Sequence, residues 1–298
     1  MSKRPLRIGV VGALTIDVNR SRGGAYSYMG GGGFYSSLSL SRMGVETVLF
    51  TAYGPDMNQE WVESLKKRGI KVYAVELERS ILFENVYQDS SRLQKASGEP
   101  SRKIFIDRSR LAGFDAVHVT PVLNEVDQSV FKELEEAGCK VSIDAQGFIR
   151  TCGVDGIVHQ VKRMLPDDAL SRVNYVHMNV DEQFFFLNHD VKELFEINPG
   201  MIVELTNSEH GSMVVYKHGC FYMPVFSVET LDPTGAGDVY AAVFLAKHLE
   251  TGSLVEASIY ASACSSIKAE KTGPFFDFNV NEVEDRVRKL KRLIENLY

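Results

Sequence analysis

Short apolar runs of strand length alternate along the chain with longer stretches in which apolar residues recur at helical spacing. The apolar runs predict buried strands at Arg7–Val11, Thr47–Ala52, Ala116–Thr120, Lys140–Ile143, Tyr175–Asn179, Met201–Leu205 and Met213–Tyr216. The stretches between them predict helices at Phe34–Arg42, Gln59–Lys67, Gln128–Glu136, Asp181–Leu187, Ala236–Leu249 and Leu254–Glu270. This alternation is typical of an α/β fold whose mainly parallel central sheet is flanked by helices on both faces.

Two segments do not follow this alternation of strand and helix patterns. Thr15–Met29 and Tyr73–Ile106 are polar, rich in tyrosine and prone to β structure, so they predict a small β lid outside the main sheet. The last segment, Val280–Tyr298, has apolar residues at helical spacing among Lys, Arg and Glu, which predicts an amphipathic closing helix. We therefore expect residues 1–298 to form one domain with a lid formed by residues 15–29 and 73–106.

The composition narrows the class of protein. With 298 residues, 44% of them hydrophobic, the chain can bury a sizeable core, and its net charge of −6 gives no broad attraction to nucleic acid or anionic lipid. The four cysteines have no metal-ligand spacing. The apolar run that follows the basic N-terminus is short and interrupted by glycines, so we interpret it as a strand rather than a signal peptide. We expect a cytoplasmic protein with no nucleic-acid or membrane partner.

The candidate chemistry is concentrated in one seven-residue string, Asp232-Pro233-Thr234-Gly235-Ala236-Gly237-Asp238. It joins a β-prone run, Phe226–Leu231, to an apolar helical run. Gly235 and Gly237 let the backbone approach an anion, and the amides of a first helical turn favour negative charge, which suits a phosphoryl group. Asp238 would then accept a proton from an attacking hydroxyl. A lone G-x-G-D is more often a tight turn in which the aspartate stabilises a helix N-terminus, so the functional interpretation depends on the full string and on motifs elsewhere in the chain.

The string resembles the C-terminal signature of the ribokinase-like (PfkB) carbohydrate kinases, D-[T/S/P]-x-G-A-G-D. Other matches follow in the family's order, and they are Asp17 after the first strand, the glycine run Gly30–Gly33 with Met43-Gly44, the turn Gly54-Pro55-Asp56, and Asn179-Val180-Asp181-Glu182 for the N-x-x-E motif. The resemblance therefore covers nearly the whole chain and predicts a ribokinase-like fold.

The resemblance also implies roles for individual residues. Asp238 would be the general base and Gly235, Ala236 and Gly237 the anion hole, while Asp17, Gly31 and Gly32 would hold the acceptor. ATP and Mg²⁺ would be the cofactors, with Asn179 and Glu182 organising the metal through water and Thr206 and Gly211 in the nucleotide-binding turn. Asp232 and Thr234 would lend backbone carbonyls to a monovalent cation, which the family sometimes uses.

Two departures from the family's pattern bear on the ligands. Tyr35 replaces an asparagine whose amide commonly contacts the acceptor, and Ser208 replaces a glycine of the nucleotide-binding turn. The first change leaves the identity of the acceptor open. The second affects the placement of the nucleotide more than phosphoryl transfer itself.

Two further segments bear on the acceptor. Phe83–Tyr87, with Arg92 and Gln94, would present polar groups from the lid to a hydroxylated ligand. Asp144–Arg150 resembles the D-x-Q-x-x-x-R segment of the inositol-kinase branch, which would place Gln146 and Arg150 beside the acceptor. These features favour a sugar or cyclitol acceptor, with myo-inositol as the leading candidate.

Several alternatives stay open at this point. A nucleoside could stack on Tyr35 or Tyr87. Gln146 and Arg150 could be a loop amide and a surface ion pair, or Arg150 could neutralise the donor's triphosphate. A non-catalytic sugar- or nucleotide-binding regulator would keep the fold without turnover, and a nicotinamide-dependent oxidoreductase lacks its glycine fingerprint. A homodimer through the lid's edge strands and a monomer both agree with the sequence.

Overall fold

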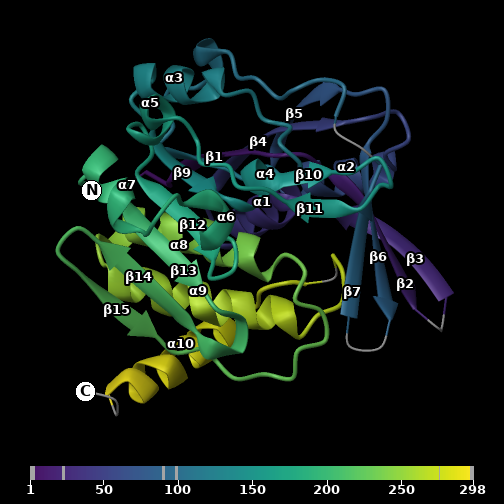
Figure 1. The fold of residues 1–298 in the computed structure, drawn as a ribbon. Coiled ribbons are helices and arrows are strands. Elements are labelled where there is room, and N and C mark those ends of the chain that lie inside the picture. The colour runs from purple at the N-terminus through teal and green to yellow at the C-terminus, as the bar shows by residue number, and fades with distance from the viewer. Residues whose placement is uncertain (1–3, 22–23, 89–90, 98–99, 275, 296–298) are drawn as a thin grey trace.

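A nine-stranded sheet forms the centre of the computed structural model, which describes residues 4–21, 24–88, 91–97, 100–274 and 276–295 (Figure 1). In spatial order its strands are β15 (Gly219–Met223), β14 (Ser212–Tyr216), β13 (Ile202–Thr206), β12 (Tyr175–Asn179), β9 (Lys140–Asp144), β8 (Ala116–Val119), β1 (Arg7–Val11), β4 (Glu46–Tyr53) and β5 (Lys71–Glu76). Neighbouring strands are parallel from β5 to β13, whereas β14 and β15 are antiparallel additions at one edge.

Helices cover both faces of this sheet because successive side chains of each buried strand point to opposite sides. In β1, Ile8 and Val10 pack in one apolar cluster and Val11 in the other. The first cluster includes residues of α1 (Gly32–Arg42), α2 (Gln59–Lys67), α8 (Ala236–Thr251), α9 (Leu254–Ala269) and α10 (Val280–Glu295). The second includes residues of α3 (Ser129–Glu136), α4 (Gln146–Ile149), α5 (Asp167–Leu170), α6 (Gln183–Phe186) and α7 (Lys192–Ile197). The predicted α/β fold class is confirmed.

A second, four-stranded sheet projects from the side of the body (Figure 1). Its strands, in spatial order, are β3 (Gly24–Gly30), β2 (Thr15–Ser21), β6 (Ile81–Gln88) and β7 (Ser91–Ala96). A short hairpin of β10 (Arg150–Cys152) and β11 (Val158–Gln160) follows α4. The four strands come from the two segments that the sequence places outside the main sheet, and their action as a lid stays a prediction.

Three stretches differ from what the sequence indicated. Lys71–Glu76 is the parallel edge strand of the main sheet, so the segment assigned to the lid begins too early at Tyr73. Its residues are half-buried or exposed, which hides the apolar signal of a sheet strand. Phe226–Leu231 forms no strand, although Leu231 donates its N–H to the carbonyl of Ala269 at 2.9 Å. The sequence also missed β15, whose residues are largely exposed.

Within the described ranges, no helix combines the length and the apolar character needed to cross a membrane.

Candidate active site

One cavity of about 540 Å³ gathers most of the residues that the sequence singles out. It lies where the carboxyl ends of the parallel strands meet the start of α8 and the four-stranded sheet, the edge at which α/β folds bind ligands. The predicted residues that line it are Asp17, Gly31, Gly32, Tyr35, Gln146, Arg150, Asn179, Glu182, Thr206, Gly211, Thr234, Gly235, Ala236, Gly237 and Asp238. Asp232 is buried and does not line the cavity, and the side chain of Tyr87 lies outside the described residues.

The turn Asp232–Gly237, which the sequence predicts as the phosphate site and which is called the phosphate turn below, requires glycine at position 235. Gly235 precedes α8 with a φ of 82°, a left-handed conformation, and a β-carbon there would overlap the ring of Tyr35. The N–H of Ala236 donates to the carbonyl of Pro233 at 3.1 Å, so this amide is engaged within the turn. The turn therefore offers the amides of Gly235 and Gly237, at the positive end of α8, to an anion.

Asp238 is held in the first turn of α8 and is only 9% exposed. Its Oδ1 accepts a hydrogen bond from Thr120 Oγ1 at 3.1 Å, and a β-carbon on Gly32 would overlap the same hydroxyl. Burial raises the pKa of Asp238 to about 7, and the negative charge of Asp144 adds to that rise. A buried carboxyl that titrates near neutral pH is suited to general-base catalysis.

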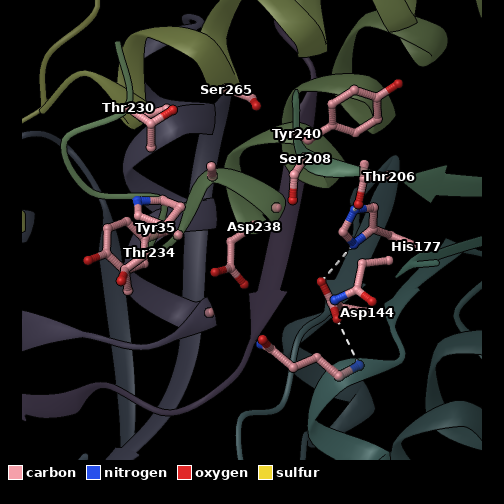
Figure 2. A pocket seen from close by; sticks show the side chains of 18 of the residues that line it. Tyr35, Asp144, His177, Thr206, Ser208, Thr230, Thr234, Asp238, Tyr240 and Ser265 are labelled. Carbon is pink, nitrogen blue, oxygen red and sulfur yellow. Dashed lines mark hydrogen bonds and ion pairs between the residues drawn. The ribbon is translucent and has the colours of Figure 1, made fainter. Parts of the chain in front are cut away.

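A buried histidine–carboxylate pair forms the opposite wall, and the sequence had not indicated it. His177 Nδ1 lies 2.9 Å from Asp144 Oδ2, and His177 Nε2 lies 3.3 Å from Thr206 Oγ1 (Figure 2). Burial disfavours the imidazolium, but the charge and hydrogen bond of Asp144 outweigh it and raise the pKa of His177 to about 9. The cavity therefore contains a cationic ring beside Gly237 at neutral pH. Its one signal in the sequence is a histidine within an apolar strand, two residues before Asn179.

Asn179 and Glu182 brace each other at the end of β12. Asn179 Oδ1 accepts from the N–H groups of Asp181 and Glu182, each at 2.8 Å, and Glu182 Oε2 accepts from the N–H of Asn179 at 2.9 Å. Burial raises the pKa of Glu182, and the neighbouring Asp144 raises it further. No cluster of three metal-ligating side chains occurs in the described part of the chain. The single carboxylate fits a magnesium ion held through water and donor phosphates better than one bound directly by protein.

The turn that follows β13 combines one residue that needs to be glycine with one that does not. Gly211 has a φ of 83°, and a β-carbon there would overlap the carbonyl of Met223. Ser208 also has a positive φ, 47°, so the serine adopts the left-handed conformation that the family's glycine would adopt more easily. The departure therefore preserves the path of the backbone at the cost of some strain.

The opposite end of the cavity is formed by side chains of the four-stranded sheet and α1. Asp17, on β2, is buried, and its Oδ1 accepts from Thr15 Oγ1 at 2.6 Å. Gln94 Nε2 donates to Asn85 Oδ1 at 3.1 Å, at the end of a chain of amides that continues to Asn19. Asp17 and Gln94 both line the cavity, so this end offers oxygen and amide groups to a polar ligand.

Tyr35 lines the cavity beside Thr234 (Figure 2). Its ring packs against Gly235 and stacks on Phe276 with centroids 5.8 Å apart. Its hydroxyl is buried and has no hydrogen-bond partner among the described residues, and burial raises its pKa well above 10. Leaving a buried hydroxyl unpaired is costly, so this hydroxyl is available to a polar ligand in the cavity.

Gln146 and Arg150 point into the cavity rather than to the surface. Gln146 begins α4, directly after β9, and Arg150 Nη2 donates to Gln146 Oε1 at 2.6 Å. Both residues line the cavity, and their contact with the acceptor stays a prediction.

Asp232 supports the turn from behind. Its carboxylate accepts from the N–H groups of Thr234 at 2.9 Å and Gly273 at 2.8 Å, and its carbonyl accepts from Lys268 Nζ at 3.2 Å. Burial opposes its ionisation, but Lys268 and these amides outweigh burial and lower the pKa of Asp232. Burial in turn lowers the pKa of Lys268 to about 8.

The comparison with family models agrees with this geometry. Residues 10–279 match the model described as the pfkB family carbohydrate kinase. The chain belongs to this family. The family prediction made from the motifs is therefore confirmed.

Individual relatives are distant. The chain is 27% identical over 172 residues to an ATP-dependent ribose-1-phosphate kinase of Halopiger xanaduensis, covering 56% of this chain and 53% of that protein. It is 28% identical over 184 residues to an inositol 3-kinase of Arabidopsis thaliana, covering 60% of this chain and 50% of that protein. The matched segments thus span about half the length of these two relatives.

Among solved structures, a sulfate complex of a pyrophosphate-dependent kinase in the ribokinase family aligns with a TM-score of 0.78. Its sequence is 21% identical, and the alignment covers 93% of this chain and 99% of that one. At this identity the likeness shows the fold, which is ribokinase-like as predicted.

Proposed function

We propose that this pfkB-family chain is an ATP-dependent kinase that transfers the γ-phosphate to a hydroxyl of a sugar or cyclitol. The observation that carries the proposal is the buried Asp238 carboxylate, which is held by Thr120 at 3.1 Å and directly follows the amides of Gly235 and Gly237. In-line transfer to a hydroxyl requires a base near the attacking oxygen and groups that stabilise the transferred phosphoryl group, and here both are provided by one short segment.

Each wall of the cavity supplies one part of this reaction. The acceptor hydroxyl gives its proton to Asp238, while the amides of Gly235 and Gly237 stabilise the transferred phosphoryl group. His177 would add positive charge to the wall that we assign to the donor, and Arg150 would do the same if it neutralises the donor's phosphates instead of contacting the acceptor. Mg²⁺, bound with the donor and held through water by Glu182, would neutralise phosphate charge.

The acceptor end favours a small ring with many hydroxyls. Asp17, Gln94 and Tyr35 line this end and offer oxygen and amide groups to ring hydroxyls, and the buried hydroxyl of Tyr35 has no hydrogen-bond partner among the described residues. The names of the two relatives, a ribose-1-phosphate kinase and an inositol 3-kinase, indicate acceptors of this type. We therefore retain myo-inositol as the leading candidate.

A nucleoside is the second candidate, and the packing of Tyr35 counts against stacking on that ring. Gly235 lies against the ring of Tyr35, and Phe276 stacks on it. Phe83, which also lines the cavity, is the aromatic residue that a nucleobase could contact instead.

A matrix of donors and acceptors tests the proposal. ATP and pyrophosphate are each incubated with myo-inositol, ribose, ribose 1-phosphate and cytidine, and the phosphorylated product is measured by mass spectrometry. We expect ATP with one ring polyol to give the highest kcat/KM. If no acceptor is phosphorylated while ligands still raise the melting temperature, the non-catalytic regulator replaces the kinase.

A further inference from the structure

A buried lysine lies directly behind the phosphate turn. Lys268, near the end of α9, is 0% exposed, and no other lysine is buried in the part of the chain that the structure describes. Its Nζ donates to the carbonyls of Asp232 at 3.2 Å and Lys271 at 3.1 Å. Burying an ammonium is costly, so a lysine at this position needs fixed acceptors around its charge.

The ammonium has the surroundings that a bare cation would have. Besides the two carbonyls, the ring of Tyr35 lies 5.6 Å from Nζ and the ring of Phe276 lies 5.9 Å from it. Both distances are within the range of cation–π attraction. The charge of Asp232 favours the ammonium as well. Backbone carbonyls, aromatic faces and a nearby carboxylate together compensate one positive charge.

The same atoms connect the turn to the segment after α9. The N–H groups of Leu231 and Asp232 donate to the carbonyl of Ala269, at 2.9 and 3.1 Å. The Asp232 carboxylate bridges the N–H groups of Thr234 and Gly273. Lys268 therefore places its charge at Asp232, three residues before Gly235, where these hydrogen bonds fix the start of the turn.

These residues do not fit the monovalent cation that the family resemblance implies. The carbonyl of Asp232, which would have been one of its ligands, already accepts from Lys268. A K⁺ or Na⁺ ion at that carbonyl would lie against the ammonium, and the two like charges would repel each other.

We propose that the ammonium of Lys268 takes the place of a monovalent cation behind the phosphate turn, so that this chain folds the turn and binds its phosphoryl donor without K⁺ or Na⁺. The fixed charge reinforces the positive end of α8 and holds the Asp232 carbonyl in the orientation that exposes the amides of Gly235 and Gly237. The inference rests on the proposed phosphoryl transfer only for its effect on turnover.

The first test uses melting temperature, which needs no acceptor. Wild-type protein and Lys268→Met are melted in 100 mM K⁺ and in tetramethylammonium at the same ionic strength. Methionine keeps a flexible chain of similar length and removes the charge. We expect the wild type to melt at the same temperature in both salts, and the variant to be stabilised by K⁺ by about 2–4 °C because K⁺ then binds the vacated carbonyls.

The matched control is Lys247→Met on α8, since the Lys247 ammonium lies over the ring of Tyr260 and pairs with Glu250, away from the cavity. This variant should gain no dependence on K⁺. Lys268→Arg retains the positive charge and should stay independent of K⁺ if the charge is what matters.

The second test measures turnover with the donor and acceptor that the matrix of donors and acceptors identifies. Added K⁺ should change wild-type kcat/KM less than twofold, whereas Lys268→Met should lose at least tenfold and regain most of it in K⁺ or NH₄⁺. A wild type that is stabilised or activated by K⁺ overturns the inference, and so does a folded Lys268→Met variant indifferent to K⁺. If Lys268→Met does not fold, the wild-type salt comparison and Lys268→Arg decide. Failure of the kinase proposal would instead appear as absent turnover with the melting pattern intact.

Discussion

The two ends of the cavity differ in whether backbone conformation or side chains form them. At the end that we assign to the donor, backbone geometry dominates, because Gly235 and Gly211 have positive φ angles and β12 carries His177 and Asn179 to the carboxyl edge of the sheet. At the end that we assign to the acceptor, side chains of the four-stranded sheet and α1 dominate, and Asp17 accepts a hydrogen bond there from Thr15. Positions that form a site through their backbone conformation, such as Gly235, can be occupied by few residue types. Positions that contact a ligand through their side chains, such as Asp17, can change residue type and thereby change the ligand.

The largest expected effect is at Asp238, which lies between the two ends. Asp238→Asn keeps the size and can still accept from Thr120, but it cannot take a proton, so kcat should fall by ~10²–10⁴-fold. The dissociation constants for donor and acceptor, measured by calorimetry, should change little. Unchanged turnover would show that another group is the base.

The pH dependence should follow the same carboxyl. Because the pKa of Asp238 is raised to about 7, the ionised base is lost as pH falls below that value. With acceptor and donor limiting, kcat/KM should fall about tenfold for each pH unit below the pKa. A profile that is flat from pH 7 to pH 5 would contradict the assigned role.

A charge change at His177 should separate the donor end from the acceptor end. His177→Gln removes the imidazolium, so kcat/KM for the donor should fall by ~10–100-fold, the range for hydrogen bonds to charged groups. The acceptor KM, measured at saturating donor, should stay the same. The double variant His177→Gln with Asp144→Asn controls for the carboxylate left without its partner.

Asp17 provides the complementary test at the acceptor end. Asp17→Asn preserves the packing against Gly30 but weakens the charge-assisted hydrogen bond to an acceptor hydroxyl, so the acceptor KM should rise about tenfold. Donor binding, followed by calorimetry without acceptor, should be unaffected. If the substitution changed only the affinity for the donor, the assignment of Asp17 to the acceptor would be wrong.

The smallest effect concerns stability. A carboxyl whose pKa is raised in the folded state destabilises the fold progressively as pH rises from its unfolded value, near 4, to about 7, and constantly above that. Asp238→Asn should therefore melt a few degrees above the wild type at pH 8, by roughly 2–4 °C or more. The difference should shrink toward pH 5, as scanning calorimetry would show.

Much of the fold was predictable from local signals. The limits of β1, α2 and β12 follow from apolar runs and helical spacing, and the observed elements have the predicted bounds. The wrong assignment of Tyr73–Glu76 to the lid and the lack of a strand at the β-prone run Phe226–Leu231 have one cause, since pairing partners decide whether an extended segment belongs to a sheet. Those partners are distant in sequence.

The sequence by itself singled out the string Asp232–Asp238, in which Gly235 permits the left-handed φ of 82° before α8 and Asp238 lies in the first turn of that helix. Only the tertiary structure revealed that Thr120 donates to Asp238, that Asp144 favours the charged form of His177, and that Lys268 donates to the carbonyl of Asp232. These pairs are separated by 118, 33 and 36 positions in the chain. Their charge states depend on burial and on partners, which the order of residues does not show until the sheet brings them together.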